Sequence, residues 1–179
     1  MRKLFKLSVI GLVIGLYCCP AVLGQCKGFH FKKDAYKGGY EMHTLWIENS
    51  VKLKSPKVKY RLNFENDKSY LLFNFYCSQE TVVKKGEELI LLNKEGETIK
   101  LIVEEDVEGI ESNFGTVKVF SYKLKLEISL EQLEKWNNVY KSARVYFNDS
   151  HMTFPFDHIR NYELFHKAKQ CYTSKLKGF

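Results

Sequence analysis

The chain has 179 residues, of which 45% are hydrophobic and 15% aromatic, and it contains only 3 prolines. This composition excludes a disordered chain and favours a packed domain that is rich in strands. Its 28 basic and 21 acidic residues give a net charge of +7. Three of the bases lie in the first 24 residues, so the remainder carries 25 bases against 21 acids, or +4, which does not indicate a nucleic-acid-binding protein.

The first 24 residues have the order of an export signal. Three basic residues open the chain, residues 7–16 (LSVIGLVIGL) form an uninterrupted apolar run, and Pro20 ends that run before a stretch of small residues. Basic, apolar and small-residue regions in this order are typical of a secretory signal peptide. We therefore predict a signal peptide over residues 1–24, cut after Gly24, and a mature chain in the periplasm, on the outer surface or outside the cell.

Two alternatives for this segment stay open. Residues 7–26 carry no charge and approach the length that spans a bilayer, so an uncleaved membrane anchor is the first alternative. Lipid attachment is the second, but it needs a small residue before the modified cysteine, and Gln25 precedes Cys26. After cleavage, no transmembrane span is expected. Residues 25–179 are long enough for one domain with its own core.

The first clear strand pattern begins after a predicted strand at residues 40–47. Apolar and basic residues alternate from 51 to 64, which predicts a half-buried strand. Ser55 and Pro56 interrupt it, so the strand bends there or lies at a sheet edge, because proline cannot donate to a ladder. Residues 70–78 return as its antiparallel partner.

A second hairpin and a long strand follow. Residues 89–92 and 98–104 are predicted to pair around a turn at Gly96, where glycine adopts a positive φ without penalty. Residues 104–111 form an acidic connection. Residues 116–128 are predicted to form a long strand.

The last part of the chain combines helices and strands. Ser129 and Gln132 have the spacing of a capping box and predict a short helix. Two short strands follow at residues 143–147 and 152–156, and a final helix is predicted over residues 158–176, capped by Asp157, with a buried stripe of Ile159, Tyr162, Phe165 and Tyr172. The prediction is a mostly β (α+β) domain: an antiparallel β-sandwich or a curved sheet, with one short helix and a C-terminal helix.

Four of these segments resemble small exported proteins of gut Bacteroidota-type bacteria. The segments are residues 86–101, the strand at 122–128, the helix start at 129–133 (SLEQL) and Ala143-Arg144-Val145. The resemblance covers about a third of the chain and consists of turn, cap and core spacing. It implies a bacterial envelope setting, and no catalytic residue is carried over from it.

Three cysteines follow the predicted signal. Cys77 lies on the apolar face of a predicted strand and is interpreted as a buried thiol. Cys26 and Cys171 lie near the two ends of the mature chain, and we predict a disulfide between them. The chain-entropy model assigns about 4–5 kcal/mol to a bridge that closes so long a loop.

The candidates for catalysis are weak. His151, Asp157 and His158 are near in sequence and form the candidate acid/base or metal site, against the simpler interpretation that they are solvated or capping residues. No nucleophile motif, paired-cysteine motif or EF-hand loop is present. The acidic residues from 104 to 111 are typical of a solvated loop. We therefore expect no cofactor and no metal.

The charge layout is the clearest functional indication. Residues 27–61 carry nine bases and three acids, whereas residues 80–111 carry ten acids and four bases. Five of the bases share one face of the predicted strand and form a candidate anion-binding stripe: Lys52, Lys54, Lys57, Lys59 and Arg61. Lys123 and Lys125 extend the stripe if their strand lies nearby. The competing interpretation is a solvated face whose lysines protect an edge strand from aggregation.

These observations predict an exported binding or interaction module without catalytic activity. The partner classes that fit the stripe are an anionic glycan, a lipid surface or another envelope protein, with nucleic acid excluded. The alternatives are a small periplasmic hydrolase with a carboxylate or histidine site and a subunit with a purely structural role. A catalytic cleft would bring His151, Asp157 or His158 to a carboxylate, whereas a binder would present a basic or aromatic face.

Overall fold

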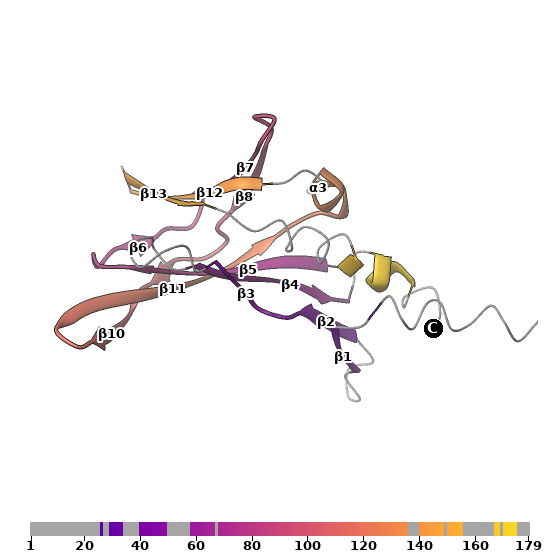
Figure 1. Cartoon of the computed structure of the whole chain (residues 1–179), viewed down its shortest axis with the longest axis horizontal. Coiled ribbons are helices and arrows are strands. Elements are labelled where there is room, and N and C mark those ends of the chain that lie inside the picture. Colours follow the sequence, from indigo (N-terminus) through magenta and orange to yellow (C-terminus); the bar gives the residue numbers. More distant parts are fainter. Residues whose placement is uncertain are drawn as a thin grey trace, which may run out of the picture.

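The computed structural model describes residues 26, 29–33, 40–49, 58–66, 68–135, 140–148, 150–155, 167–168 and 170–174 (Figure 1). In chain order its strands are β1 (Phe29–Lys33), β2 (Tyr40–Thr44), β3 (Ile47–Asn49), β4 (Val58–Glu65), β5 (Lys68–Cys77), β6 (Val82–Val83), β7 (Glu88–Asn93), β8 (Thr98–Ile102), β9 (Val107–Glu108), β10 (Ile110–Phe114), β11 (Val117–Glu127), β12 (Tyr140–Phe147) and β13 (Ser150–Pro155). Helix α3 (Leu130–Lys135) follows β11, and residues 167–168 and 170–174 are helical.

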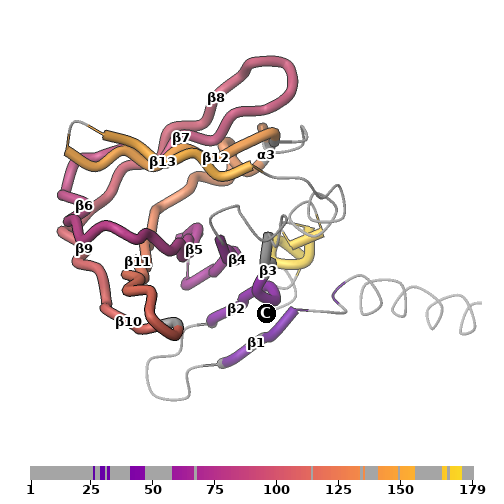
Figure 2. The backbone as a smooth tube through the Cα atoms, turned by 60° about the vertical axis from the view of Figure 1, so that its left-hand side comes forward, coloured from indigo at the N-terminus to yellow at the C-terminus, as the bar shows by residue number. Residues whose placement is uncertain are grey.

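The strands form two large antiparallel sheets and one small ribbon. The seven-stranded sheet has the order β1-β2-β4-β5-β11-β10, with β3 also paired to β4, and the four-stranded sheet has the order β13-β12-β7-β8. Strands β6 and β9 form the ribbon. The four-stranded sheet lies across the inner face of the larger one, so the described fold has two strand layers (Figures 1 and 2). The prediction of a mostly β, antiparallel α+β domain is confirmed.

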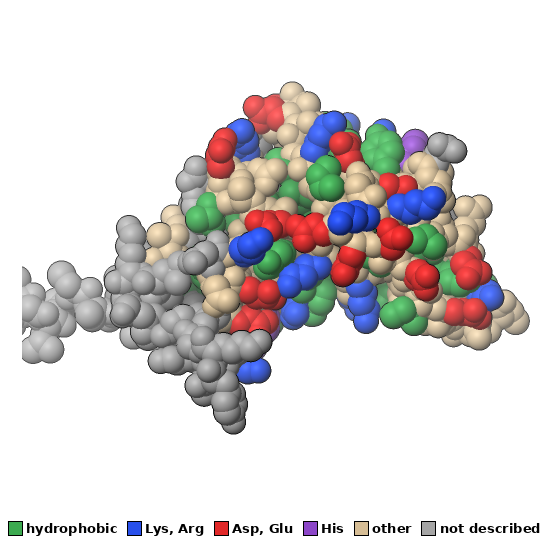
Figure 3. Space-filling view, turned by 180° about the vertical axis from the view of Figure 1, so that it is seen from behind, with side chains coloured by type: hydrophobic (Ala, Val, Ile, Leu, Met, Phe, Trp, Pro, Cys, Tyr) green, Lys and Arg blue, Asp and Glu red, His purple; other side chains and the backbone are tan. Residues whose placement is uncertain are grey.

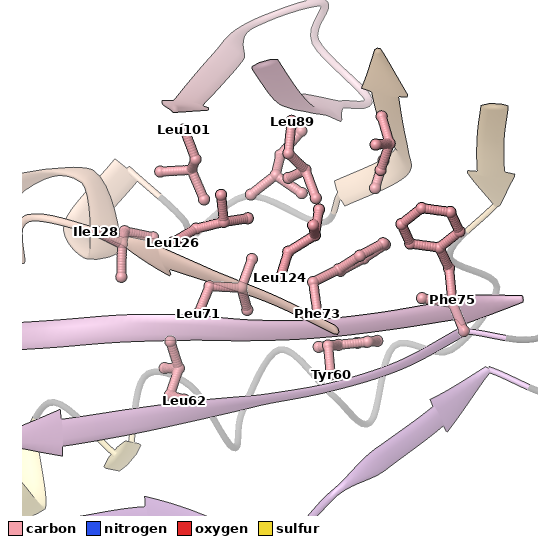
Figure 4. Packing of buried hydrophobic residues seen from close by; sticks show 14 of the residues in the cluster. Tyr60, Leu62, Leu71, Phe73, Phe75, Leu89, Leu101, Leu124, Leu126 and Ile128 are labelled. Atoms are coloured by element: carbon pink, nitrogen blue, oxygen red, sulfur yellow. The ribbon is translucent and has the colours of Figure 1, made fainter. Parts of the chain in front are cut away.

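The core lies between these two layers because alternate residues of each strand point inward. Phe73 and Phe75 of β5 and Leu124 of β11 are fully buried, and they face Leu89 and Leu101 of the other sheet (Figure 4). Each such side chain contributes about 1.5–3 kcal/mol when it leaves water. The period-two pattern in the sequences of β4, β5 and β11 therefore identifies the face of each strand that packs inward.

The C-terminal helical segment packs against β4 of the seven-stranded sheet. The Tyr172 ring stacks on Phe64 of β4 with a centroid distance of 4.5 Å. Cys171 forms a disulfide with Cys26, with a Cα–Cα distance of 5.5 Å. The bridge, which the sequence predicted, joins residues 145 positions apart and ties the C-terminal helical segment to a residue three positions before β1.

The local features predicted at the β7–β8 turn and at the start of α3 are both present. Gly96 has a φ of +89° in the turn between β7 and β8. Ser129 Oγ accepts a hydrogen bond from the Gln132 amide at 3.0 Å, and Gln132 Oε1 accepts one from the Ser129 amide at 2.8 Å, so the capping box is confirmed.

Two expectations need correction. The alternative that placed the 51–64 strand at a sheet edge is wrong for β4, which pairs with β2 and β3 on one side and with β5 on the other. Residues 110 and 111, expected at the end of the acidic connection over residues 104–111, belong to β10 (Ile110–Phe114), which pairs with β11. This strand was not predicted, because an edge strand can expose its side chains to water and the middle of its sequence (IESNF) is polar.

Some expectations fall outside the described residues. These are the signal segment, the bend at Ser55 and Pro56, and most of the helix predicted over residues 158–176, including Ile159, Tyr162 and Phe165. Tyr172, from the same predicted stripe, is buried. Among the residues that the structure describes, no helix has the length and apolar character that crossing a membrane requires.

Candidate functional site

The predicted anion-binding stripe is only partly visible. Lys52, Lys54 and Lys57 lie outside the described residues, whereas Lys59 and Arg61 are half-buried on β4. Both point away from the core, because the alternate residues of β4 from Val58 to Phe64 are the buried ones. The outer face of the seven-stranded sheet is thus the first place to look for a site.

Strand pairing extends this basic surface across the sheet. Lys59 is opposite Asn74 of β5, which is in turn opposite Lys123 of β11. In the next outward-facing row of the sheet, Arg61 and Lys125 are both opposite Leu72 of β5. The two lysines of β11 therefore share the face of Lys59 and Arg61, separated from them by one strand.

Two lysines on this face form ion pairs with glutamates. Lys125 Nζ lies 2.9 Å from Glu65 Oε2 and 4.1 Å from the centre of the Tyr70 ring, and the hydrogen bond to Glu65 raises the pKa of Lys125. Lys68 is paired with Glu127 at 2.7 Å. Acidic and basic side chains are interspersed over the surface seen in Figure 3. The paired lysines therefore contribute little net positive potential.

Arg61 is different, because in the described part of the chain no carboxylate pairs with it. Its guanidinium carbon lies 4.7 Å from the centre of the Trp46 ring, and its Nε is buried without a hydrogen-bond acceptor among the described residues. A half-buried charge without a counter-ion or a full set of hydrogen bonds is costly to the fold. Arg61 is therefore the described cation that would gain most from an incoming anion.

Two imidazoles lie beside Arg61. His43 of β2 is opposite Asn63 of β4 on one side and His30 of β1 on the other, and the two imidazole rings stack with centroids 5.1 Å apart. His43 Nδ1 is 3.9 Å from Glu41 Oε1. Burial lowers the pKa of His43, Arg61 and His30 lower it further, and Glu41 raises it. His43 is thus held neutral near pH 7.

Asn63 completes the group. Its Nδ2 donates to Glu65 Oε1 at 2.6 Å, while its Oδ1 is buried with no donor among the described residues. His43 Nδ1 is likewise buried without a hydrogen bond. We call His30, His43, Trp46, Arg61 and Asn63 the His43–Arg61 cluster. Three neighbouring polar side chains of this cluster each keep an unused hydrogen-bonding atom, and such atoms cost about 1–3 kcal/mol each when left unsatisfied.

The predicted catalytic residues are not brought together by the described structure. His151 is exposed on β13, with its ring 5.7 Å from that of Tyr146, and Asp157 and His158 lie outside the described residues. Cys77 is a buried free thiol whose sulfur accepts a hydrogen bond from the Gln79 amide. Across the described ranges, no three His, Cys, Asp or Glu residues are grouped so as to hold a metal ion.

The acidic segment after β8 has a local structural role. Asp106 Oδ1 accepts a hydrogen bond from the Lys85 amide at 2.8 Å, and Glu111 pairs with Lys118 at 2.9 Å. The first contact ties the turn before β7 to the loop before β9, and the second joins β10 to β11. Residues 104–106 form the loop that was expected, whereas residues 107–108 and 110–111 of the predicted connection lie in β9 and β10.

Sequence reasoning missed most of the His43–Arg61 cluster. The strand at residues 40–47 was predicted, but His43 and Trp46 were not assigned to a site. The available signal was the alternation of Glu41, His43 and Leu45 with Met42 and Thr44, which places a histidine on the outward face. Its proximity to Arg61 depends on the pairing of β2 with β4, which the local pattern does not contain.

No protein-family model matches the chain, and no curated protein or solved structure is significantly similar to it. The resemblance to small exported bacterial proteins therefore stays a prediction. The His43–Arg61 cluster and the basic residues around it are the features of the described structure that indicate a function.

Proposed function

We propose that this chain is an exported, non-catalytic binding module of the bacterial envelope, and that it engages an anionic ligand through the outer face of the seven-stranded sheet. The observation that carries the proposal is Arg61. It is half-buried in an interior strand, it stacks against Trp46, and no described carboxylate pairs with it. An anion bound at this position supplies the missing counter-charge and accepts hydrogen bonds from the guanidinium.

The position of β4 argues against the simpler account of these bases. Lysines that protect a sheet from aggregation belong on an edge strand, where unpaired backbone groups invite another chain. Strand β4 has partners on both sides, so Lys59 and Arg61 protect no edge. Edge protection therefore does not explain Arg61, and ligand binding supplies another explanation for it.

The mixture of charges selects among the possible partners. A lipid surface is bound by dense clusters of unpaired lysines and arginines. Here Glu65 and Glu127 neutralise Lys125 and Lys68 on the same face. A discrete anionic group that reaches Arg61 between these pairs fits better than a flat anionic membrane. An acidic glycan is therefore the partner class that we favour.

Binding to dextran sulfate, measured by calorimetry over a range of salt concentrations, tests the proposal. The affinity should fall steeply with salt, as expected for released counter-ions. Arg61→Ala should lose about tenfold in affinity, because a hydrogen-bonded charge contributes about 1.5–3 kcal/mol. Arg61→Lys should retain part of the binding.

Lys68→Ala is the matched control, because Lys68 is a basic residue of the same sheet that is already paired. Thermal unfolding of each variant shows whether the fold is retained. An affinity that does not respond to salt, or an equal loss in the Arg61 and Lys68 variants, would overturn the proposal.

A further inference from the structure

We propose that the group recognised by the His43–Arg61 cluster is the carboxylate of a uronic-acid sugar, that the sugar ring packs against Trp46, and that binding takes up a proton on His43. This inference rests on the proposed anion-binding function and names the class of its ligand.

The unused hydrogen-bond donors and acceptors of the cluster indicate a ligand that carries a carboxylate with a hydroxyl group close to it. Arg61 offers donors, and His43 offers a second donor when Nδ1 carries a proton, so two oxygens of one planar carboxylate can be held. Asn63 Oδ1 is an acceptor without a donor among the described residues. A uronic acid carries hydroxyl groups on its ring close to the carboxylate, and one of these can donate to Asn63. Inorganic sulfate has no such donor.

The exposed apolar side chains beside the cations favour a sugar ring. Trp46 is 42% exposed and Leu45 is 53% exposed, although both are large apolar residues. A pyranose ring has one face made mainly of C–H groups, which packs on an indole ring while its hydroxyls stay in water. A small inorganic anion would leave this apolar pair uncovered.

The access to the cluster requires a side chain to move. The unused atoms of His43, Arg61 and Asn63 are closed to solvent, and the Trp46 ring lies over the Arg61 guanidinium. A ligand therefore reaches the guanidinium as the indole shifts from it onto the sugar. Because the indole is partly exposed and joins no hydrogen bond among the described residues, this shift breaks mainly the contact with Arg61.

The charges around His43 make binding sensitive to pH. His30 faces it from β1, Arg61 and Glu65 lie on β4, and Glu41 lies on its own strand. Among the described residues, Arg61 and His30 disfavour a proton on His43 and Glu41 favours one. A bound carboxylate adds a second negative charge and shifts this balance toward the imidazolium. The affinity should therefore rise as the pH falls from 7.5 to 5.5, where a uronic carboxylate is still ionised.

The test compares an oligogalacturonate, dextran sulfate and neutral dextran by calorimetry and by tryptophan fluorescence. The oligogalacturonate should bind and change the fluorescence, and this change should be absent in Trp46→Phe. Its affinity should increase on lowering the pH, by at most about tenfold per pH unit for one proton. His43→Asn should lose most of that pH dependence. His151→Asn, which changes an exposed histidine of the other sheet, should keep it.

The outcomes separate this inference from the proposed function. If dextran sulfate binds and oligogalacturonate does not, the anion site stands and the uronic-acid inference is wrong. If oligogalacturonate binds without a change between pH 7.5 and 5.5, the proton uptake is wrong. If neither polymer binds, or if neutral dextran binds equally well, both the inference and the proposed function are wrong.

Discussion

The guanidinium carbon of Arg61 lies 4.7 Å from the centre of the Trp46 ring, on the side of the sheet that faces away from the core. Such a contact stabilises a protein by about 0.5–2 kcal/mol, depending on how far the cation is desolvated. It does not replace a counter-ion, and Lys125 on the same face shows the contrast, since it pairs with Glu65 and contacts Tyr70. Arg61 is therefore held in place by an aromatic side chain, and no carboxylate among the described residues neutralises its charge.

Replacing Glu41 with Gln should strengthen anion binding. Among the described residues, Glu41 is the carboxylate that raises the pKa of His43, and its Oε1 lies 3.9 Å from His43 Nδ1. Its removal should lower the pKa of His43, which an NMR titration of the imidazole protons measures. It should also raise the affinity for dextran sulfate at pH 7.5 by about two- to threefold, because a competing negative charge is lost. Glu111→Gln, far along the sheet, should change neither quantity.

The stability of the protein should decrease as the pH falls below about 6.5. Burial holds the pKa of His43 in the folded chain below its usual value of 6.5, so the unfolded chain binds a proton more readily. Stability is then complete above 6.5 and is lost as the pH falls from 6.5 through the folded pKa. Thermal unfolding between pH 7.5 and 5.0 should show a smaller decrease in Tm for His43→Asn than for the wild type. An identical decrease in the two proteins would contradict the role of His43.

Replacing Gly109 with Ala should destabilise the fold by about 1–3 kcal/mol through overpacking. A methyl group at this position would lie 2.6 Å from Cζ and the hydroxyl oxygen of Tyr122 and 2.9 Å from Cβ of Phe120. The Tyr122 hydroxyl accepts a hydrogen bond from the Thr81 amide at 2.9 Å, so the ring cannot move without breaking that bond. Urea unfolding measures the loss. Glu108→Ala, at an exposed neighbouring position, should have little effect, and equal stability of the two variants would refute the explanation.

Reduction of the Cys26–Cys171 disulfide should lower the free energy of unfolding by about 2–5 kcal/mol. The bridge spans 145 residues and ties the C-terminal helical segment to Cys26, just before β1. Urea unfolding with and without a reductant measures the effect, and a Cys26→Ala, Cys171→Ala double variant should no longer respond to the reductant.

The same disulfide can be counted by mass. Alkylation of a denatured, unreduced chain that begins at Gln25 should modify one thiol, that of Cys77, and alkylation after reduction should modify three. Three modified thiols before reduction would show that the bridge is absent from the native protein.

The local patterns of the chain were enough to predict several elements correctly. Alternation in β4 and β5 identified the buried side of each strand, and Ser129 and Gln132 identified the start of α3. These features depend on neighbours within a few residues, so the sequence alone contains them. By contrast β10 was missed, because residues 110–113 are all exposed and no alternation of buried and exposed residues marks the strand.

The sequence by itself determined which side of β4, β5 and β11 meets the core and which residues begin the short helix. Only the tertiary structure decided that β4 is an interior strand, that His43 lies beside Arg61, and that Trp46 contacts the guanidinium. The physical reason is that a period of two specifies a face but not a partner. Strand order and register come from contacts between residues far apart in the chain, and these place the imidazoles, the guanidinium and the indole together.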